Sequence, residues 1–184
     1  MNLDSYSGAT RVIFIVGDPI AQVKSPYGVT EAMRAHGAEV IVVPAHVKPA
    51  DIDDFFALTV RMPNVDGIIV TVPHKFDAAR LCAHVSPRAR SIGAANVVRR
   101  AADGTWEADM CDGEGYVAGL RQAGCEPKGK RALLVGAGGA GSAIAQAGSA
   151  AQQAVLAEII GGTRIAAFAH AEPEAYHELT RVQT

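Results

Sequence analysis

The sequence lacks a long apolar run, a strong charge imbalance and a large set of cysteines. No run reaches the roughly 20 residues that span a bilayer, and no basic segment leads into an apolar one near the start, so we expect no membrane partner and no signal peptide. A net charge of −2 over 184 residues does not favour nucleic acid as a partner. The 3 cysteines show no CxxC spacing, which predicts free thiols in a reducing cytoplasm and no metal site.

Short β-branched runs alternate with helical patterns along the first two-thirds of the chain. Strands are predicted over 12–16, 40–43, 65–72 and 131–135, and helices over 26–36, 52–60, 74–84 and 113–122. Asp103-Gly104, between the segments 94–98 and 105–108, is typical of a hairpin turn, and Ser86-Pro87 is expected to end the helix before it. The pattern predicts an α/β fold with βαβ units and a mainly parallel sheet.

The polar segment 123–130, which contains Gly124, Pro127 and Gly129, marks a change of organisation. We therefore predict an N-terminal substrate-binding domain over residues 1–122. A partial Rossmann-like nucleotide-binding domain is predicted over residues 123–184.

A glycine-rich turn follows the predicted strand 131–135. It consists of Gly136, Ala137, Gly138, Gly139, Ala140 and Gly141, and fits G-x-G-x-x-G between a strand and a helix. Such glycines let the backbone approach a pyrophosphate at a helix N-terminus, which predicts dinucleotide binding; a turn without ligand is the alternative. Glu172 is the candidate for a ribose contact, but it lies well beyond the usual spacing of about 20 residues, which favours an ordinary exposed glutamate.

Lys75 and Asp112 are the candidate acid–base residues. Lys75 follows the strand 65–72, at the strand end where open α/β sheets bind ligands, and Asp112 precedes a predicted helix. A solvated lysine and a helix-capping aspartate are the alternatives. If the two side chains face each other, they form a proton-transfer pair.

Five motifs in order resemble the shikimate dehydrogenase family. They are Gly17-Asp18-Pro19-Ile20 with Ser25-Pro26, Val70-Thr71-Val72-Pro73-His74-Lys75, Ile92-Gly93-Ala94-Ala95-Asn96, Asp112-Gly113-Glu114-Gly115 and the glycine-rich turn. The resemblance implies a cytoplasmic enzyme of aromatic amino acid biosynthesis that reversibly reduces 3-dehydroshikimate, or a related cyclitol acid, with NADP or NAD.

The resemblance also implies roles for individual residues. Lys75 is implied as the acid–base residue and Asp112 as its partner. Ser25, Thr71 and Asn96 are implied to bind the ring hydroxyls or the carboxylate of the substrate.

The chain departs from the family pattern where polar residues are expected. Val23, Ile69 and Met110 stand where the family has a serine and two asparagines. Losing a hydrogen bond to a charged group costs about 1.5–3 kcal/mol, so we expect a preference for a related acid such as quinate, or slow turnover of shikimate.

The remaining strands of the family's nucleotide domain are not recognisable after about residue 147, which leaves three hypotheses. The first is a dehydrogenase, and the second is a truncated, non-catalytic substrate-binding module. The third, a nucleotide-binding regulator, would not need the pair of Lys75 and Asp112. An incomplete nucleotide domain would also leave sheet edges for a partner to cover, so a homo-oligomer stays open.

Overall fold

The structure is a computed structural model that describes residues 6–128. The chain divides into two compact units, residues 1–112 and 113–184. The glycine-rich turn Gly136–Gly141, the strand predicted over 131–135 and Glu172 lie outside the described residues. The predicted domain limits of 1–122 and 123–184 stay a prediction.

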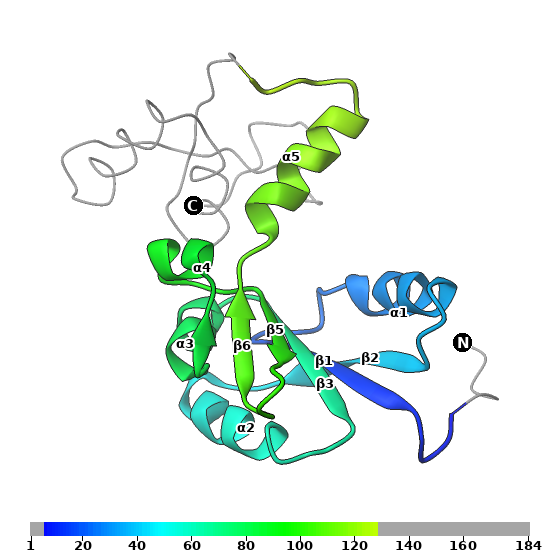
Figure 1. Cartoon of the computed structure of the whole chain (residues 1–184), viewed down its shortest axis with the longest axis vertical. Helices are drawn as coiled ribbons and strands as arrows, with labels where there is room; N and C mark the ends of the chain where they lie inside the picture. Colours follow the sequence, from blue (N-terminus) through cyan, green and yellow to red (C-terminus); the bar gives the residue numbers. More distant parts are fainter. Residues whose placement is uncertain (1–5, 129–184) are drawn as a thin grey trace. The chain divides into compact units, whose positions relative to one another are not determined.

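The first unit is built on a mixed sheet flanked by short helices (Figure 1). Its described residues form a 6-stranded sheet with the order β2-β1-β3-β5-β6-β4. The strands are β1 (Arg11–Gly17), β2 (Val40–His46), β3 (Val65–Val70), β4 (His84–Val85), β5 (Val97–Arg100) and β6 (Trp106–Asp109). Its helices are α1 (Ser25–Ala35), a 3₁₀ turn η1 (Pro49–Asp51), α2 (Ile52–Thr59), α3 (Lys75–Leu81) and α4 (Pro87–Ile92). The next helix, α5 (Asp112–Gln122), belongs to the second unit except for its first residue.

Strand β1 lies between β2 and β3 and is parallel to both. The chain moves to one side of β1 through α1 and returns through α2, so right-handed crossovers place these helices on opposite faces of the sheet. Figure 1 shows α1 and α2 on opposite sides of these strands. The predicted α/β class with a mainly parallel sheet is confirmed.

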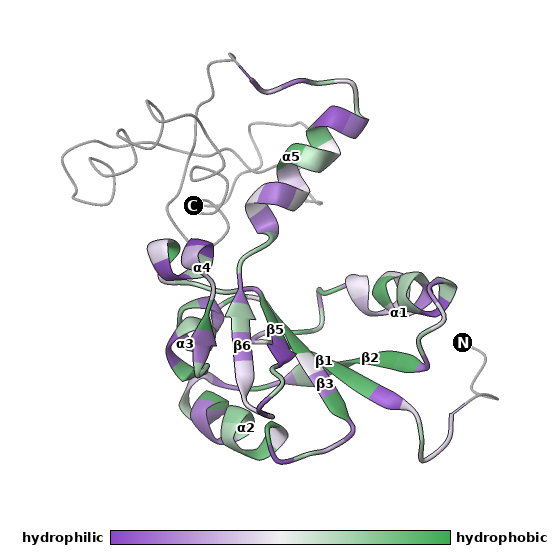
Figure 2. Ribbon diagram, viewed as in Figure 1, coloured by the Kyte–Doolittle hydropathy of each residue, from purple (hydrophilic) through white to green (hydrophobic). Residues whose placement is uncertain are grey.

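The strands supply most of the core. Figure 2 shows β1 and β2 as hydrophobic along most of their length, as expected for strands that helices cover. Val16, Val70 and Ile68 are at most 2% exposed. Thr30 of α1 is buried as well, and its hydroxyl accepts a hydrogen bond from Val42 N–H in β2 (3.0 Å). This bond fixes α1 against the strand that it covers.

Strands β5 and β6 form the predicted hairpin. They pair antiparallel from Val97 with Asp109 to Arg100 with Trp106. Gly104 in the turn has φ +84°, a conformation that glycine adopts without strain. Because β5 is antiparallel to β3, β6 runs in the same direction as β3.

The segment after α3 differs from the sequence prediction. The helix predicted over 74–84 ends at Leu81, Cys82 is extended, and His84–Val85 form the short strand β4. Ser86-Pro87 begins a helix instead of ending one. The Ser86 hydroxyl accepts a hydrogen bond from Ala89 N–H (3.2 Å) and caps α4, while proline suits the first helical turn because it needs no N–H partner there.

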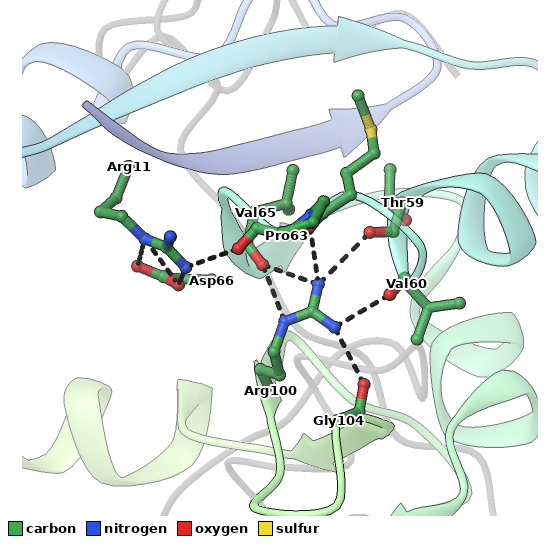
Figure 3. A network of polar contacts seen from close by, with 9 residues as sticks. Arg11, Thr59, Val60, Pro63, Val65, Asp66, Arg100 and Gly104 are labelled. Carbon is green, nitrogen blue, oxygen red and sulfur yellow. Dashed lines mark hydrogen bonds and ion pairs between the residues drawn. The ribbon is translucent and has the colours of Figure 1, made fainter. Parts of the chain in front are cut away.

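Arg100, at the end of β5, ties the turn between α2 and β3 to the hairpin (Figure 3). Its guanidinium donates to backbone carbonyl oxygens of Val60 (2.9 Å), Met62 (3.0 Å), Val65 (2.9 Å) and Gly104 (2.9 Å). The same group lies 4.5 Å from the ring centroid of Trp106. In the same figure Arg11 pairs with Asp66 on the neighbouring strands β1 and β3.

The described part of the second unit consists mainly of α5, which confirms the helix predicted over 113–122. The helix ends before Gly124, which has φ +80°, and Cys125 N–H bonds back to Leu120 O (2.8 Å). Among residues 6–128, no helix combines the length and apolar character needed to cross a membrane.

Candidate active site

The sheet topology brings the predicted site residues to one edge. Strands β1, β3 and β6 run in one direction, so their carboxyl ends lie at the edge where antiparallel β5 begins. Ser25 follows β1, Thr71 and Lys75 follow β3, Asn96 precedes β5, and Asp112 follows β6. Residues far apart in sequence therefore meet at the edge where open α/β sheets bind ligands.

Lys75, Asn96 and Asp112 form a connected cluster at this edge. Lys75 Nζ donates to Asp112 Oδ2 (2.6 Å), and Asn96 Nδ2 donates to Asp112 Oδ1 (2.6 Å). Both carboxylate oxygens are thus engaged, one by a cation and one by an amide. The Lys75 side chain is 13% exposed and that of Asp112 26%, so the pair is largely covered but open to solvent.

Backbone hydrogen bonds hold the cluster in place. Cys111 N–H donates to Asn96 Oδ1 (2.7 Å), which fixes both ends of the Asn96 amide. Ala95 N–H donates to the backbone oxygen of Lys75 (2.8 Å), so the start of α3 is bound to the segment that leads into β5. The protein's own hydrogen bonds therefore hold the cluster, as a preorganised site requires.

Thr71 and Ser25 lie at the same edge but do not contact this cluster through any hydrogen bond found among the described residues. Their hydroxyl groups form no hydrogen bond within that part of the chain, which leaves them available to a ligand. Ser25 is exposed at the first residue of α1. Thr71 lies against Gly17: a Cβ at Gly17 would come within 2.5 Å of Thr71 Cγ2. The added Cβ would also meet the backbone oxygen of Val72 at 3.0 Å, so a side chain where β1 ends would force its neighbours to shift.

A second polar group anchors the end of β6, just before Asp112. The Asp109 carboxylate accepts hydrogen bonds from Ser86 Oγ (2.5 Å), Arg88 Nε (2.6 Å) and Met110 N–H (2.8 Å). The Arg88 guanidinium, opposed by partial burial and helped by Ser86 and Met110, holds the pKa of Asp109 well below its usual range. Asp109 is therefore ionised at neutral pH and fixes α4 to β6.

The described cysteines and acidic residues show no sign of a metal centre. Within residues 6–128, no group of three or more His, Cys, Asp or Glu side chains is arranged to hold a metal ion. Burial raises the pKa of the Cys82 thiol to about 12, so this residue is not a thiolate nucleophile at neutral pH.

Sequence reasoning gave no role to two histidines at this edge. His74 is fully buried beside Lys75, and its Nε2 lies 2.7 Å from Val47 O. His46 Nε2 lies 2.6 Å from Asp18 Oδ1 and joins the end of β2 to the loop after β1. The position of His74 between a proline and the candidate catalytic lysine was the one sequence signal for a role of this residue. The contact of His74 with Val47 and that of His46 with Asp18 cannot be predicted from local sequence patterns.

Residues 15–98 match the family model described as the shikimate dehydrogenase substrate binding domain. Residues 15–98 thus belong to the family of shikimate dehydrogenase substrate binding domains. The match covers the strands and loops that carry Ser25, Thr71, Lys75 and Asn96, and it stops short of Asp112.

Curated relatives agree with this family assignment. Shikimate dehydrogenase (NADP(+)) of Geobacter metallireducens is 39% identical over 138 residues, which is 74% of this chain and 48% of that protein. The enzyme of the same name from Anaeromyxobacter sp. strain K is 40% identical over 77% of this chain and 50% of its own length. The chain thus spans about half the length of the curated relatives it matches.

Solved structures share the fold. A crystal structure of shikimate 5-dehydrogenase from Listeria monocytogenes in complex with shikimate and NAD matches with a TM-score of 0.71 and 31% identity, over 78% of this chain and 50% of that one. The enzyme from Thermus thermophilus in complex with shikimate matches with a TM-score of 0.71 and 27% identity, over 83% and 62%.

Proposed function

We propose that this chain carries the substrate-binding and proton-transfer half of a shikimate dehydrogenase-type oxidoreductase. Its reaction would be the reversible, NADP- or NAD-dependent reduction of a ring ketone such as that of 3-dehydroshikimate. The observation that carries this proposal is the cluster of Lys75, Asn96 and Asp112 at the carboxyl edge of the sheet. A lysine bound to a carboxylate and still open to solvent suits proton exchange with a hydroxyl or ketone oxygen.

Lys75 would transfer the proton of the reaction. When a hydride adds to the ketone carbon, negative charge develops on the oxygen, and the Lys75 ammonium gives that oxygen a proton to form the hydroxyl. In the oxidative direction the neutral amine takes the proton back. Because Asp112 holds Nζ at 2.6 Å, the amine does not have to be oriented during the reaction.

Asn96 and Asp112 would serve this step by holding each other and the lysine. Asn96 donates to one carboxylate oxygen of Asp112 and leaves the other oxygen to Lys75. The hydroxyl groups of Ser25 and Thr71, at the same edge, form no hydrogen bond with any described residue and would bind the hydroxyls or the carboxylate of the substrate. Met110, buried at 2% exposure, offers no polar contact, so we expect a thinner set of hydrogen bonds around the ring and a preference for a related acid such as quinate.

The nicotinamide cofactor, when bound, supplies or accepts the hydride. Its proposed binding residues, Gly136, Ala137, Gly138, Gly139, Ala140 and Gly141, lie outside the described residues, and the fit rests on the spacing of their glycines. The relatives named NADP(+)-dependent and the Listeria complex with NAD support either dinucleotide.

The test is an absorbance assay at 340 nm on the 184-residue chain, with shikimate or quinate and NADP or NAD. Lys75→Met removes the ammonium and keeps most of the side-chain volume. Lys48→Met is the matched control, because Lys48 is exposed in the loop before η1. We expect turnover in the wild type and the control, and a loss of at least about 100-fold in kcat for Lys75→Met.

A binding measurement distinguishes the proposed dehydrogenase from a module that binds the substrate without turnover. Calorimetric titration with shikimate and quinate is run on the same samples. Binding without turnover in a folded wild-type chain would favour the non-catalytic substrate-binding module. Turnover that survives Lys75→Met would contradict the proposed role of Lys75.

A further inference from the structure

His74 is a fully buried polar residue directly before Lys75. Its side chain is 0% exposed, and the residue occupies the N-cap position of α3 without a capping hydrogen bond from its side chain; Lys75 is the first residue of this helix. His74 Nε2 lies 2.7 Å from the backbone oxygen of Val47, which is 27 residues earlier in the chain. A carbonyl oxygen only accepts, so Nε2 carries the hydrogen and donates it. The other ring nitrogen, Nδ1, then has a free lone pair, and no described residue donates to it.

The Nδ1 atom without a partner lowers the free energy of unfolding. A buried polar atom without a partner is unfavourable, and an apolar side chain of similar volume would leave none. His74 therefore has a feature that packing alone does not explain. The Nε2 hydrogen bond is the only interaction of the ring that the described residues show to be directional.

The bond joins the start of α3 to the end of β2. Val47 follows β2 directly, and its own N–H donates to Gly17 O at the end of β1 (3.3 Å). On the other side, Lys75 O accepts from Ala95 N–H (2.8 Å). The backbone around Lys75 is thus held from two directions, by the His74 ring toward β2 and by Ala95 toward β5.

We propose that His74 is a positioning residue for Lys75, and this inference rests on the proposed function. The ring fixes the orientation of the first turn of α3 and thereby the direction in which the Lys75 side chain reaches Asp112. His74 touches neither of these reacting groups through a hydrogen bond; it acts through the backbone of Lys75. Loss of the Nε2 donor would loosen the contact of 2.6 Å between Lys75 Nζ and Asp112 Oδ2.

A pair of amide variants isolates the Nε2 bond. In His74→Gln the amide nitrogen reaches about as far as Nε2 and can still donate to Val47 O, whereas the side chain of His74→Asn is one methylene shorter and cannot. His74→Met provides a second variant without a donor, in case the asparagine variant does not fold. Thr59→Val is the control, because Thr59 is also buried (2% exposed) with a hydroxyl bonded to Phe55 O (2.7 Å), away from this edge of the sheet.

Two measurements are made on each full-length variant. The first is steady-state turnover with the acid that the wild type uses. The second is competitive acetylation with acetic anhydride, in which mass spectrometry compares the rate at Lys75 with that at exposed Lys48. Acetylation reports the exposure and pairing of the Lys75 amine and does not depend on turnover or on the cofactor.

We expect His74→Asn and His74→Met to lower kcat by about 10- to 100-fold with KM changed less than about 3-fold, the pattern of a misplaced catalytic group. Acetylation of Lys75 relative to Lys48 should rise by about 3-fold or more, because the amine is released from Asp112. His74→Gln should restore both values to within about 3-fold of the wild type, and Thr59→Val should change neither.

The inference is overturned if Lys75 acetylation in both variants without a donor equals that of the wild type, or if His74→Gln behaves like His74→Asn. It is also overturned if Thr59→Val lowers kcat as much as they do, because the effect would then be general destabilisation. A wild-type chain without turnover would count against the proposed function alone, and the acetylation ratios would still decide the role of His74.

Discussion

Replacing Arg100 with methionine should destabilise the first unit more than any change of a surface arginine. Methionine keeps much of the apolar stem and removes the guanidinium that holds the turn between α2 and β3 (Figure 3). Four backbone oxygens lose a donor at 2.9–3.0 Å, namely those of Val60, Met62, Val65 and Gly104. The contact of 4.5 Å with the Trp106 ring is lost as well.

The size of the effect follows from these contacts. The four bonds share one guanidinium and several of the carbonyl groups are partly exposed, so we use about 1 kcal/mol net for each instead of the roughly 1.5–3 kcal/mol of a bond to a charged group, and four bonds contribute about 4 kcal/mol. The cation–π contact adds about 0.5–1 kcal/mol. Water replaces part of this at the partly exposed carbonyl groups, so we expect Arg100→Met to lower the free energy of unfolding by about 3–4 kcal/mol.

The assay is urea unfolding followed by the fluorescence of Trp106, which is the 1 tryptophan in the chain and is 3% exposed. Arg99→Met is the matched control: its side chain is 72% exposed and pairs with Glu107 at the surface, so the unfolding midpoint should stay unchanged. A loss below about 1 kcal/mol for Arg100→Met at an unchanged m-value would refute the reasoning. Circular dichroism on the same samples checks that fluorescence reports unfolding and not only the lost contact with the ring.

Two further predictions concern the edge that carries the site. Gly17→Ala should destabilise the chain by about 1–3 kcal/mol and raise KM for the substrate more than it lowers kcat. The reason is that the added Cβ would come within 2.5 Å of Thr71 Cγ2. An unchanged KM and an unchanged melting temperature would contradict this. Asp109 has a lowered pKa in the folded state through Arg88, so its contribution to stability is present above the unfolded pKa of about 3.9 and is lost as the pH falls through the folded pKa. Asp109→Asn should therefore be less stable than the wild type at pH 6 and lose less stability on acidification. Urea unfolding from pH 6 to pH 2.5 measures this, and a free energy of unfolding that falls equally with pH in both proteins would argue against the pairing of Asp109 with Arg88.

The parts of the fold that could be predicted are those with a strong local pattern. β1 and β2 contain the continuous apolar runs of residues 12–16 and 40–43, and the hairpin of β5 and β6 is marked by Asp103-Gly104. The prediction for the segment after α3 was wrong because the elements of this segment are too short to show a periodicity. β4 has 2 residues, α4 has 6, and Ser86-Pro87 suits the start of a helix as well as a turn.

The site was predicted in its residue types but not in its contacts. The family motifs named Lys75 and Asp112, and the structure joins them across 37 residues of sequence. The resemblance implied Asn96 only as a substrate contact, whereas its amide is bonded at both ends, to Asp112 and to Cys111 N–H. Such pairings depend on which strands are neighbours, and the strand order of the sheet cannot be predicted from local sequence patterns.

The position of this cluster separates the two halves of the proposed reaction. Lys75, Asn96 and Asp112 all belong to the first compact unit, and the glycine-rich turn belongs to the second. Among the described residues, the hydrogen bonds that hold Lys75 all come from the first unit, including the one from His74 to Val47 after β2, so we expect the geometry for proton transfer not to require residues 113–184. A substitution at Gly138 that abolishes dinucleotide binding should therefore stop turnover and leave the acetylation of Lys75 unchanged. The reverse result, a change at Lys75 caused by a substitution in the glycine-rich turn, would mean that the first unit alone does not set the lysine.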